Sequence, residues 1–325
     1  MKTLFLDANI ILDFYRFGSD DLDQIEALVA LIDGNEIELL SNSHLKNEVS
    51  RNREKVLAEA ISKLGNKFSI RTPRICEGLA KASELNAILK EANSKLSDLQ
   101  NELEDKAKNG SLRSDLLIER MFQLSKELPI TEKVLETAIQ SVKLGNPPGK
   151  SGSYGDAIHW QSLLTSKQRN INLVTRDGDF ISELDGSSLK KFLRDEWTSS
   201  KKYSDVTLFS SLSSFLNTHF PKIKLSEETA KNELIENLAA SSSFATTHAI
   251  IDKLHKFDFY TQSQVSRLFD VLLENSQVYR IATDNDVKSF YLKQQKKAIW
   301  LPASTTESAA AILGVDHDLV FGIPF

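Results

Sequence analysis

The sequence predicts an α/β fold with a central parallel sheet, interrupted by an inserted helical hairpin and followed by a mainly helical domain. Short apolar runs alternate with helically spaced segments over residues 1–220, which is typical of parallel strands joined by crossover helices. A leucine heptad interrupts this alternation within about residues 77–145. Residues 226–325, beyond Pro221 and a polar stretch, show mainly helical patterns. With 325 residues the chain is long enough for about two domains.

The N-terminal part contains two predicted strand–helix pairs. The strands are short and apolar, and the first helix has hydrophobic residues at helical spacing. Asp7-Ala8-Asn9 stands at the end of the first strand, Gly34 ends the first helix, and Ser41-Asn42-Ser43 supplies a cap for the second helix. In chain order the predicted elements are strand Thr3–Leu6, helix Asp20–Ile32, strand Glu36–Leu40 and a helix from about His44 to Leu64.

The next region has the spacing of a helical hairpin. A heptad seam is formed by Leu85, Leu89, Ala92, Leu96, Leu99 and Leu103. Asn109-Gly110-Ser111 breaks the seam, and helical spacing continues from Leu112 to Leu128. We expect two long antiparallel helices that pack on each other, because the hairpin then supplies its own apolar partner. A dimerising coiled coil is the alternative.

The α/β pattern resumes after the hairpin. In chain order the remaining elements are a Gly- and Pro-rich loop at 145–152, a helix from Gly155 to about Thr165, a strand at Ile171–Thr175, a strand at Val206–Phe209 and a helix to about Asn217. Asp156 lies in the first turn of its helix, and Arg176-Asp177-Gly178-Asp179-Phe180 follows the third strand. The acids of this region therefore stand beside predicted strand ends and helix starts.

The C-terminal domain is predicted to be helical and acidic. Thr261 and Gln264 form a capping-box signature ahead of an apolar periodic segment, and Asp284 or Asn285 caps a further helix. Residues 226–325 contain 9 Lys and Arg against 13 Asp and Glu, a net charge of −4. This balance argues against nucleic-acid binding by the domain itself.

Composition excludes several protein classes. Hydrophobic residues make up 41% and charged residues 26% of the chain, ordinary values for a soluble globular protein. The net charge of −5 provides no global basic signal for nucleic acid, although a metal site collects acids locally. Cys76 is the only cysteine, so an intrachain disulfide is excluded. We expect a cytoplasmic protein without membrane association, because no signal-peptide core and no run of ~18 apolar residues is found.

Four acidic residues stand at corresponding places of the predicted elements. Asp7 ends the first strand, and Asp177 follows the third. Glu48 lies one turn into the helix after the second strand, and Asp156 begins the helix before the third. We expect these four carboxylates to meet, because functional side chains gather at the carboxyl ends of parallel strands. Hard divalent cations take oxygen ligands, and two such ions can hold a scissile phosphate and activate water.

The arrangement resembles the PIN domain family of nucleases over roughly residues 1–220. The resemblance rests on Asp7-Ala8-Asn9, on Glu48 in the helix after the second strand, on Gly155-Asp156-Ala157 and on the run Thr175–Phe180. The helical insertion and the long loop before Gly155 are more similar to a larger bacterial subclass than to the compact toxin-type members.

This resemblance implies a three-layer fold and an endonuclease that depends on Mg²⁺ or Mn²⁺. Such enzymes commonly cleave single-stranded or structured RNA, so RNA is favoured over DNA. The family's four acidic positions map onto Asp7, Glu48, Asp156 and Asp177, as catalytic residues and metal ligands, with Asp179 as a further candidate ligand. The resemblance also suggests a role in bacterial defence or stress response.

Four polar residues near these acids are candidates for substrate binding. Asn9 and Thr175 could position water or substrate, and Lys150 and Arg176 could hold phosphates. Each has an ordinary interpretation as well: capping of local backbone for the first two and a solvated surface position for the second two. Asp13 is a further acid near the end of the first strand and competes with the assigned one.

Two histidines lie close to the assigned acids in the sequence. His44 shares a helix face with Glu48, and His159 follows Asp156 by about one turn. A lone histidine at such a position more often makes a helix contact than binds a metal ion. We therefore expect oxygen ligands alone.

Two other functional classes fit this sequence less well than the nuclease. The loop Gly145–Ser151 is one residue short of a P-loop and follows a helix, which excludes that mode of nucleotide binding. An aspartyl phosphatase usually has a second Asp two residues after Asp7, where this chain has Asn9. Two alternatives stay open: a non-catalytic nucleic-acid- or protein-binding protein, and an effector controlled by a regulatory partner or by homo-oligomerisation through the insertion or the C-terminal domain.

Overall fold

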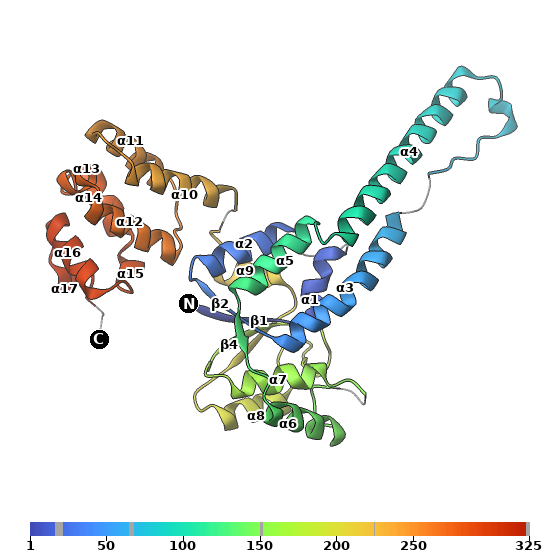
Figure 1. The fold of residues 1–325 in the computed structure, drawn as a ribbon, viewed down its shortest axis with the longest axis horizontal. Helices are drawn as coiled ribbons and strands as arrows, with labels where there is room; N and C mark the ends of the chain where they lie inside the picture. The colour runs from blue at the N-terminus through green and yellow to red at the C-terminus, as the bar shows by residue number, and fades with distance from the viewer. Residues whose placement is uncertain (17–21, 65–67, 150–151, 224, 323–325) are drawn as a thin grey trace. The chain divides into compact units, whose positions relative to one another are not determined.

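The fold is built around a five-stranded sheet. The computed structural model describes residues 1–16, 22–64, 68–149, 152–223 and 225–322. Within these residues the strand order is β3-β2-β1-β4-β5, and the pairs β2–β3, β1–β4 and β4–β5 are parallel (Figure 1). The strands are β1 (Lys2–Leu6), β2 (Ile37–Asn42), β3 (Lys126–Leu128), β4 (Ile171–Val174) and β5 (Val206–Phe209). The predicted α/β fold with a central parallel sheet is confirmed.

Helices cover both faces of this sheet, which gives the predicted three layers. The helices of the N-terminal two thirds are α1 (Ala8–Leu12), η1 (Asp13–Tyr15), α2 (Leu22–Asp33), α3 (Ser43–Leu64), η2 (Arg74–Cys76), α4 (Ala80–Lys108), α5 (Arg113–Leu124), α6 (Glu132–Lys143), α7 (Gly155–Thr165), α8 (Lys191–Ser200) and α9 (Leu212–His219). Figure 1 shows α6, α7 and α8 on one face and α1, α3 and α5 on the other. The apolar sides of both layers bury the sheet between them.

The central strands are the most apolar ones, and they set the place of the candidate site. All four residues of β4 are buried, as are Leu4, Phe5 and Leu6 of β1. Leu6 is in register with Val174, and the next residue, Asp7, donates its backbone N–H to the Val174 carbonyl oxygen at 3.0 Å. The residues after β1 and β4 therefore leave the sheet side by side at its carboxyl edge.

Strand β3 corrects one prediction. Helical spacing predicted a helix through Leu128, but α5 ends at Leu124 and residues 126–128 pair with β2. Three residues are too few to show the two-residue alternation by which a strand is recognised in a sequence. The strand forms because the edge of β2 offers unpaired backbone groups to the chain that passes beside it.

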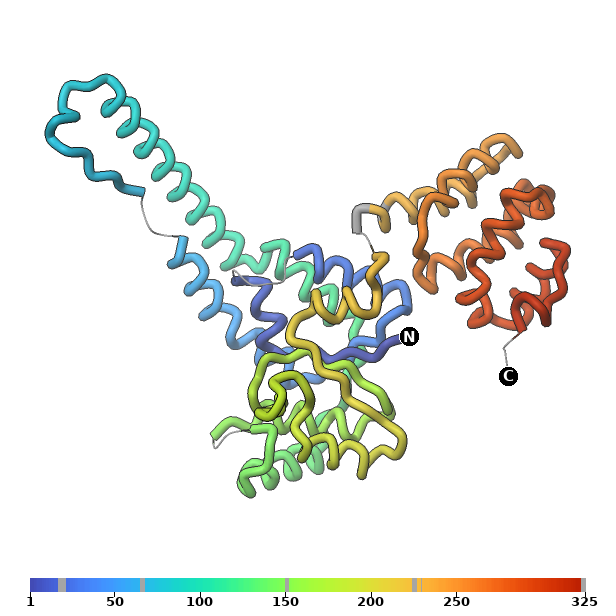
Figure 2. The backbone as a smooth tube through the Cα atoms, turned by 180° about the vertical axis from the view of Figure 1, so that it is seen from behind, coloured from blue at the N-terminus to red at the C-terminus, as the bar shows by residue number. Residues whose placement is uncertain are grey.

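The insertion is helical as predicted, but its pairing differs from the expected hairpin. The long helix α4 packs along α3, and Figure 2 shows the two side by side, with α4 extending beyond α3. Arg53 of α3 fastens this pair, since its guanidinium donates to the Ala107 carbonyl oxygen at 2.9 Å and to Asp115 at 2.6 Å. None of the residues of α4, all of which are described, is buried. Residues after Asn109 form the short helix α5, so a long second helix is not present to be the partner.

The chain forms two compact units. One comprises Thr3–Ile25 and Leu39–Phe215; the other comprises Met1–Lys2, Glu26–Glu38 and Leu216–Phe325. The second unit contains α10 (Leu225–Ala239), α11 (Phe244–Leu254), α12 (Gln262–Glu274), α13 (Ser276–Arg280), α14 (Asn285–Lys293), α15 (Gln295–Ala298), α16 (Ala303–Leu313) and α17 (His317–Val320). Its capping box of Thr261 and Gln264 is formed as predicted. The boundary between residues 220 and 226 stays a prediction. Among the described residues, no helix combines the length and apolarity that a membrane span requires.

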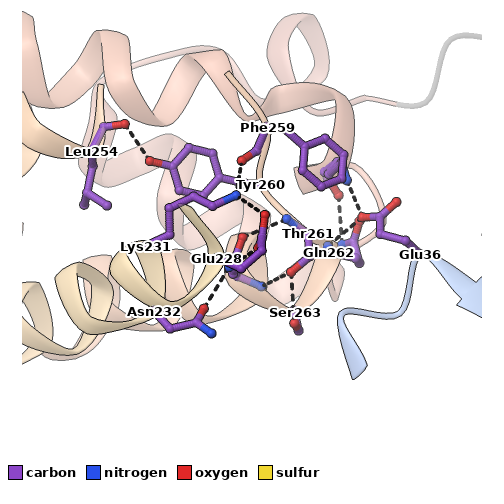
Figure 3. A network of polar contacts seen from close by, with 12 residues as sticks. Glu36, Glu228, Lys231, Asn232, Leu254, Phe259, Tyr260, Thr261, Gln262 and Ser263 are labelled. Carbon is purple, nitrogen blue, oxygen red and sulfur yellow. Dashed lines mark hydrogen bonds and ion pairs between the residues drawn. The ribbon is translucent and has the colours of Figure 1, made fainter. Parts of the chain in front are cut away.

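A buried ion pair lies within the C-terminal unit (Figure 3). Lys231 is only 1% exposed, and its ammonium donates to Glu228 Oε1 at 2.5 Å and to the Phe259 carbonyl oxygen at 2.7 Å. Glu228 is also buried, and its second oxygen accepts from Gln264 Nε2 at 3.0 Å. A cation in this place is tolerated because its charge and its protons are met by partners.

Candidate active site

A buried threonine joins two of the predicted acids at the sheet edge. Asp7 is 5% exposed, and its Oδ2 accepts a hydrogen bond of 2.7 Å from Thr175 Oγ1. The same Thr175 oxygen accepts the backbone N–H of Asp177 at 3.0 Å. Thr175 therefore sets the orientation of both neighbours. Because Thr175 is 1% exposed and its hydroxyl donates its hydrogen bond to Asp7, the predicted contact with substrate is not the role that the geometry favours.

Asp156 lies in the first turn of α7, where it faces the other acids. Burial is the largest of the effects that raise its pKa to about 7, and the negative charges of Asp7, Asp177 and Glu48 contribute to the same rise in that order. Burial also raises the pKa of Asp7, against the hydrogen bond from Thr175 that lowers it. Carboxylates that raise each other's pKa must lie close together. Asp7, Asp177 and Glu48 thus lie near enough to Asp156 for their charges to act on it, and these four acids are called the acidic cluster below. That they form one metal site stays a prediction.

Glu48 differs from its neighbours because a histidine contacts it. Glu48 Oε2 lies 3.3 Å from His159 Nε2 and 3.9 Å from His44 Nε2. The hydrogen bond with His159 is the largest of the effects that lower the pKa of Glu48, and burial opposes it. Glu48 therefore stays ionised at a pH where Asp156 still holds a proton.

Asp179 holds the preceding loop. Its Oδ2 accepts the backbone N–H of Gly149 at 3.3 Å, and its own N–H donates to Asp177 Oδ1 at 2.8 Å. The charge of Asp177 is one of the largest effects that raise the pKa of Asp156. Asp179 is thus engaged with the backbone of the Gly149 loop, whereas the charge of Asp177 acts on Asp156.

The remaining residues predicted to contact substrate are Asn9, Arg176 and Lys150, and their surroundings differ. Asn9 is exposed beside the site, at the start of α1. The Arg176 side chain is 45% exposed and forms an ion pair with Asp13, which is also in reach of Arg16 at 3.5 Å. Asp13 is thus occupied by cations rather than by the acidic cluster. Lys150 lies outside the described residues.

Sequence reasoning set the two histidines aside, and the fold brings them together at Glu48. One ligand atom each of His44, Glu48 and His159 lies within 4.8 Å of the other two, a spacing that could hold a metal ion. The side chain of Asn42, predicted only as part of a cap, contacts His159 Nδ1 at 3.2 Å. The sequence does contain a signal for this contact. His44 and Glu48 lie one turn apart on one helix, and Asp156 and His159 lie about one turn apart on another.

The donor atoms fit a divalent cation. The acidic cluster offers carboxylate oxygens, the ligands that Mg²⁺ and Mn²⁺ prefer. The raised pKa of Asp156 records a repulsion among these carboxylates that a cation would relieve. A nitrogen-containing set such as His44, Glu48 and His159 would instead suit a softer transition metal.

The raised pKa of Asp156 predicts how the metal-free protein responds to pH. The unfolded chain releases this proton near the ordinary value of 3.8, whereas the folded protein holds it to about 7. The contribution of Asp156 to stability should therefore fall as the pH rises from about 4 to about 7 and should not fall further above that. Asp156→Asn should remove this pH dependence and raise the free energy of unfolding at pH 8 by about 1–3 kcal/mol. Converting the whole pKa shift of Asp156 into free energy would give ~4 kcal/mol, but the neighbouring acids share the shift because their titrations are coupled.

Urea denaturation in chelator at pH 5 and pH 8 measures this difference. Glu183→Gln is the matched control, because it removes one negative charge from a side chain that is 89% exposed. Equal slopes with pH for Asp156→Asn and the unmodified protein would contradict the crowding of carboxylates at the site.

Comparison with known proteins identifies the family of the chain. No curated protein and no solved structure matches the chain. A family model described as PIN domain matches residues 4–180, more than half of the chain and the span that contains all four acids of the cluster. PIN domains are generally nucleases. The chain therefore belongs to the PIN domain family.

Proposed function

We propose that the protein is a metal-dependent endonuclease that hydrolyses phosphodiester bonds in RNA. The observation that carries this proposal is the cluster of carboxylates at the sheet edge, in which burial and three neighbouring acids raise the pKa of Asp156 to about 7. Perturbed acids gathered at the carboxyl ends of strands are typical of functional sites. Membership of the PIN domain family supports the nuclease class.

Each acid has a proposed part in the reaction. Asp7, Asp156 and Asp177 would hold Mg²⁺ or Mn²⁺, and Glu48 would orient the attacking water. Such an ion, when bound, lowers the pKa of water and neutralises charge on the scissile phosphate. Thr175 keeps Asp7 and Asp177 in place through hydrogen bonds of 2.7 and 3.0 Å, so the ligands are oriented before an ion arrives.

Two residues are proposed to contact the substrate. Arg176 is 45% exposed, and its partner Asp13 is a carboxylate that a substrate phosphate would replace. Asn9 is exposed at the start of α1, directly after the β1 strand end, where an amide can bind a phosphate or a sugar hydroxyl. A role of Lys150 in phosphate binding stays a prediction. The preference for RNA rests on the likeness to other members of the family.

The test is cleavage of a labelled single-stranded RNA and a DNA of the same sequence, with Mg²⁺, Mn²⁺ or chelator. We expect RNA to be cleaved with Mg²⁺ and with Mn²⁺. No cleavage is expected in the presence of chelator. A thermal scan on the same samples should show that millimolar Mn²⁺ raises the unfolding temperature, because the ion binds only the folded site. Cleavage that persists in chelator, or a folded protein that shows neither cleavage nor a thermal shift, would refute the proposal.

A further inference from the structure

The Asn42 amide has a defined orientation. Asn42 is the last residue of β2 and is fully buried. Its Oδ1 accepts the backbone N–H of Leu45 at 2.8 Å and so caps α3. Since the oxygen is used in this way, the amide nitrogen must point to the other side, where it lies 3.2 Å from His159 Nδ1.

This orientation decides which ring nitrogen of His159 carries the proton. An amide nitrogen has only donors, so the Nδ1 atom facing it must offer a lone pair. The ring proton is then on Nε2, which lies 3.3 Å from Glu48 Oε2. His159 is 2% exposed, and the rings of Phe5 and His44 stand at 5.6 and 5.2 Å from it, which keeps the ring in this plane.

The same proton argues against His159 as a metal ligand. The three atoms of His44, Glu48 and His159 have the spacing of a metal site. Coordination through His159 Nε2 needs a lone pair on that atom and an acceptor for Nδ1–H. Asn42 presents a donor instead, and turning its amide over would set a second donor against the Leu45 N–H and break the cap.

We propose that His159 is a positioning residue that donates its Nε2–H to Glu48 and is itself oriented by Asn42. The hydrogen bond fixes one oxygen of the Glu48 carboxylate and leaves the other to act in the site. The role of Glu48 rests on the proposed nuclease function, whereas the proton position in His159 does not depend on it.

The proton position is measured directly by ¹⁵N NMR of the metal-free protein labelled at histidine. The signals of His159 are identified by their loss in His159→Gln. We expect Nε2 to be protonated and Nδ1 to be unprotonated. The opposite tautomer would overturn the proposal, and it would do so whether or not the protein cleaves RNA. Conversely, the expected tautomer in a protein that cleaves neither RNA nor DNA would refute only the nuclease.

Two substitutions of His159 separate its two hydrogen bonds. In His159→Gln the longer amide reaches the place of Nε2 and can still donate to Glu48. In His159→Asn the shorter amide can meet Asn42 but cannot reach Glu48. We expect His159→Asn to lower kcat by about 10- to 100-fold with little change in KM, the range typical of residues that orient a ligand. His159→Gln should stay within about threefold of the unmodified protein, and equal losses in both variants would overturn the proposal.

Asn42→Asp reverses the polarity at His159 Nδ1 and keeps the cap, since Asp caps helices as well as Asn does. The new carboxylate can accept a proton on Nδ1, so that Nε2 can release its own proton and offer a lone pair when a metal ion binds. This variant, unlike the unmodified protein, should bind Co²⁺ through histidine nitrogen, as seen in the visible absorption of the ion. Nitrogen-bound Co²⁺ in the unmodified protein, lost in His159→Gln, would assign the histidine as a metal ligand and overturn the proposal.

Discussion

Asp156→Asn is expected to abolish metal-dependent cleavage while the protein remains folded. The substitution removes one negative oxygen from the centre of the cluster, where Asp7, Asp177 and Glu48 act on Asp156. Loss of a group that only orients a metal ligand costs about 10- to 100-fold, so loss of a direct ligand should cost at least about 100-fold in kcat/KM. The initial rate of RNA cleavage in Mn²⁺ measures this loss.

The stability of the variant distinguishes a site residue from a structural one. Asp156→Asn should raise the stability of the metal-free protein above pH 7, because the raised pKa of Asp156 means that ionising this carboxyl costs free energy in the folded protein. It should also reduce the stabilisation by Mn²⁺. Asp195→Asn is the matched control, because it removes the same charge from a side chain of α8 that is 60% exposed. Asp156→Asn with more than a tenth of the original rate would remove Asp156 from the ligand set.

Lys231→Met is expected to lower the free energy of unfolding by about 3–5 kcal/mol, the cost of leaving one partner of a buried ion pair behind. Lys231 and Glu228 are 1% and 5% exposed, so water cannot replace the missing ammonium. The Phe259 carbonyl oxygen loses its donor as well. Chemical denaturation, followed by a probe in the C-terminal unit, measures the loss.

The double variant Lys231→Met with Glu228→Gln shows whether the charge or the packing is responsible. It removes both charges and leaves an amide that still accepts from Gln264, so we expect it to recover at least half of the lost stability. Lys256→Met is the control for a lysine whose side chain is 69% exposed, and it should change stability by less than about 0.5 kcal/mol. A single variant as stable as this control would show that the buried pair contributes nothing.

Local patterns in the sequence were sufficient for the central strands and for the acids beside them. Helices cover both faces of β1 and β4, so the residues of these strands are buried and mostly apolar. A short, continuous apolar run in the sequence therefore predicts such a strand. Asp7 and Asp177 follow such runs, and Asp156 begins a helix. The placement of Asp7 and Asp177 at one edge follows from the parallel pairing of β1 and β4. The match of residues 4–180 to the PIN domain agrees with this reading of the pattern.

Pairings between distant segments were decided only by the tertiary structure. Strand β3 has only three residues, and it forms because it pairs with the edge of β2. Helix α4 packs on α3, whereas the sequence predicted a second helix of the insertion as its partner. The contacts of Asn42 with His159 and of His159 with Glu48 join residues 117 and 111 positions apart. Periodicity reports whether a side chain is buried or exposed, but the identity of its neighbour depends on how whole elements pack. For that reason the sequence by itself determined the fold class and named four acids as candidates, whereas the hydrogen bonds of Asp7, Asp177 and Glu48 became visible only in the folded chain.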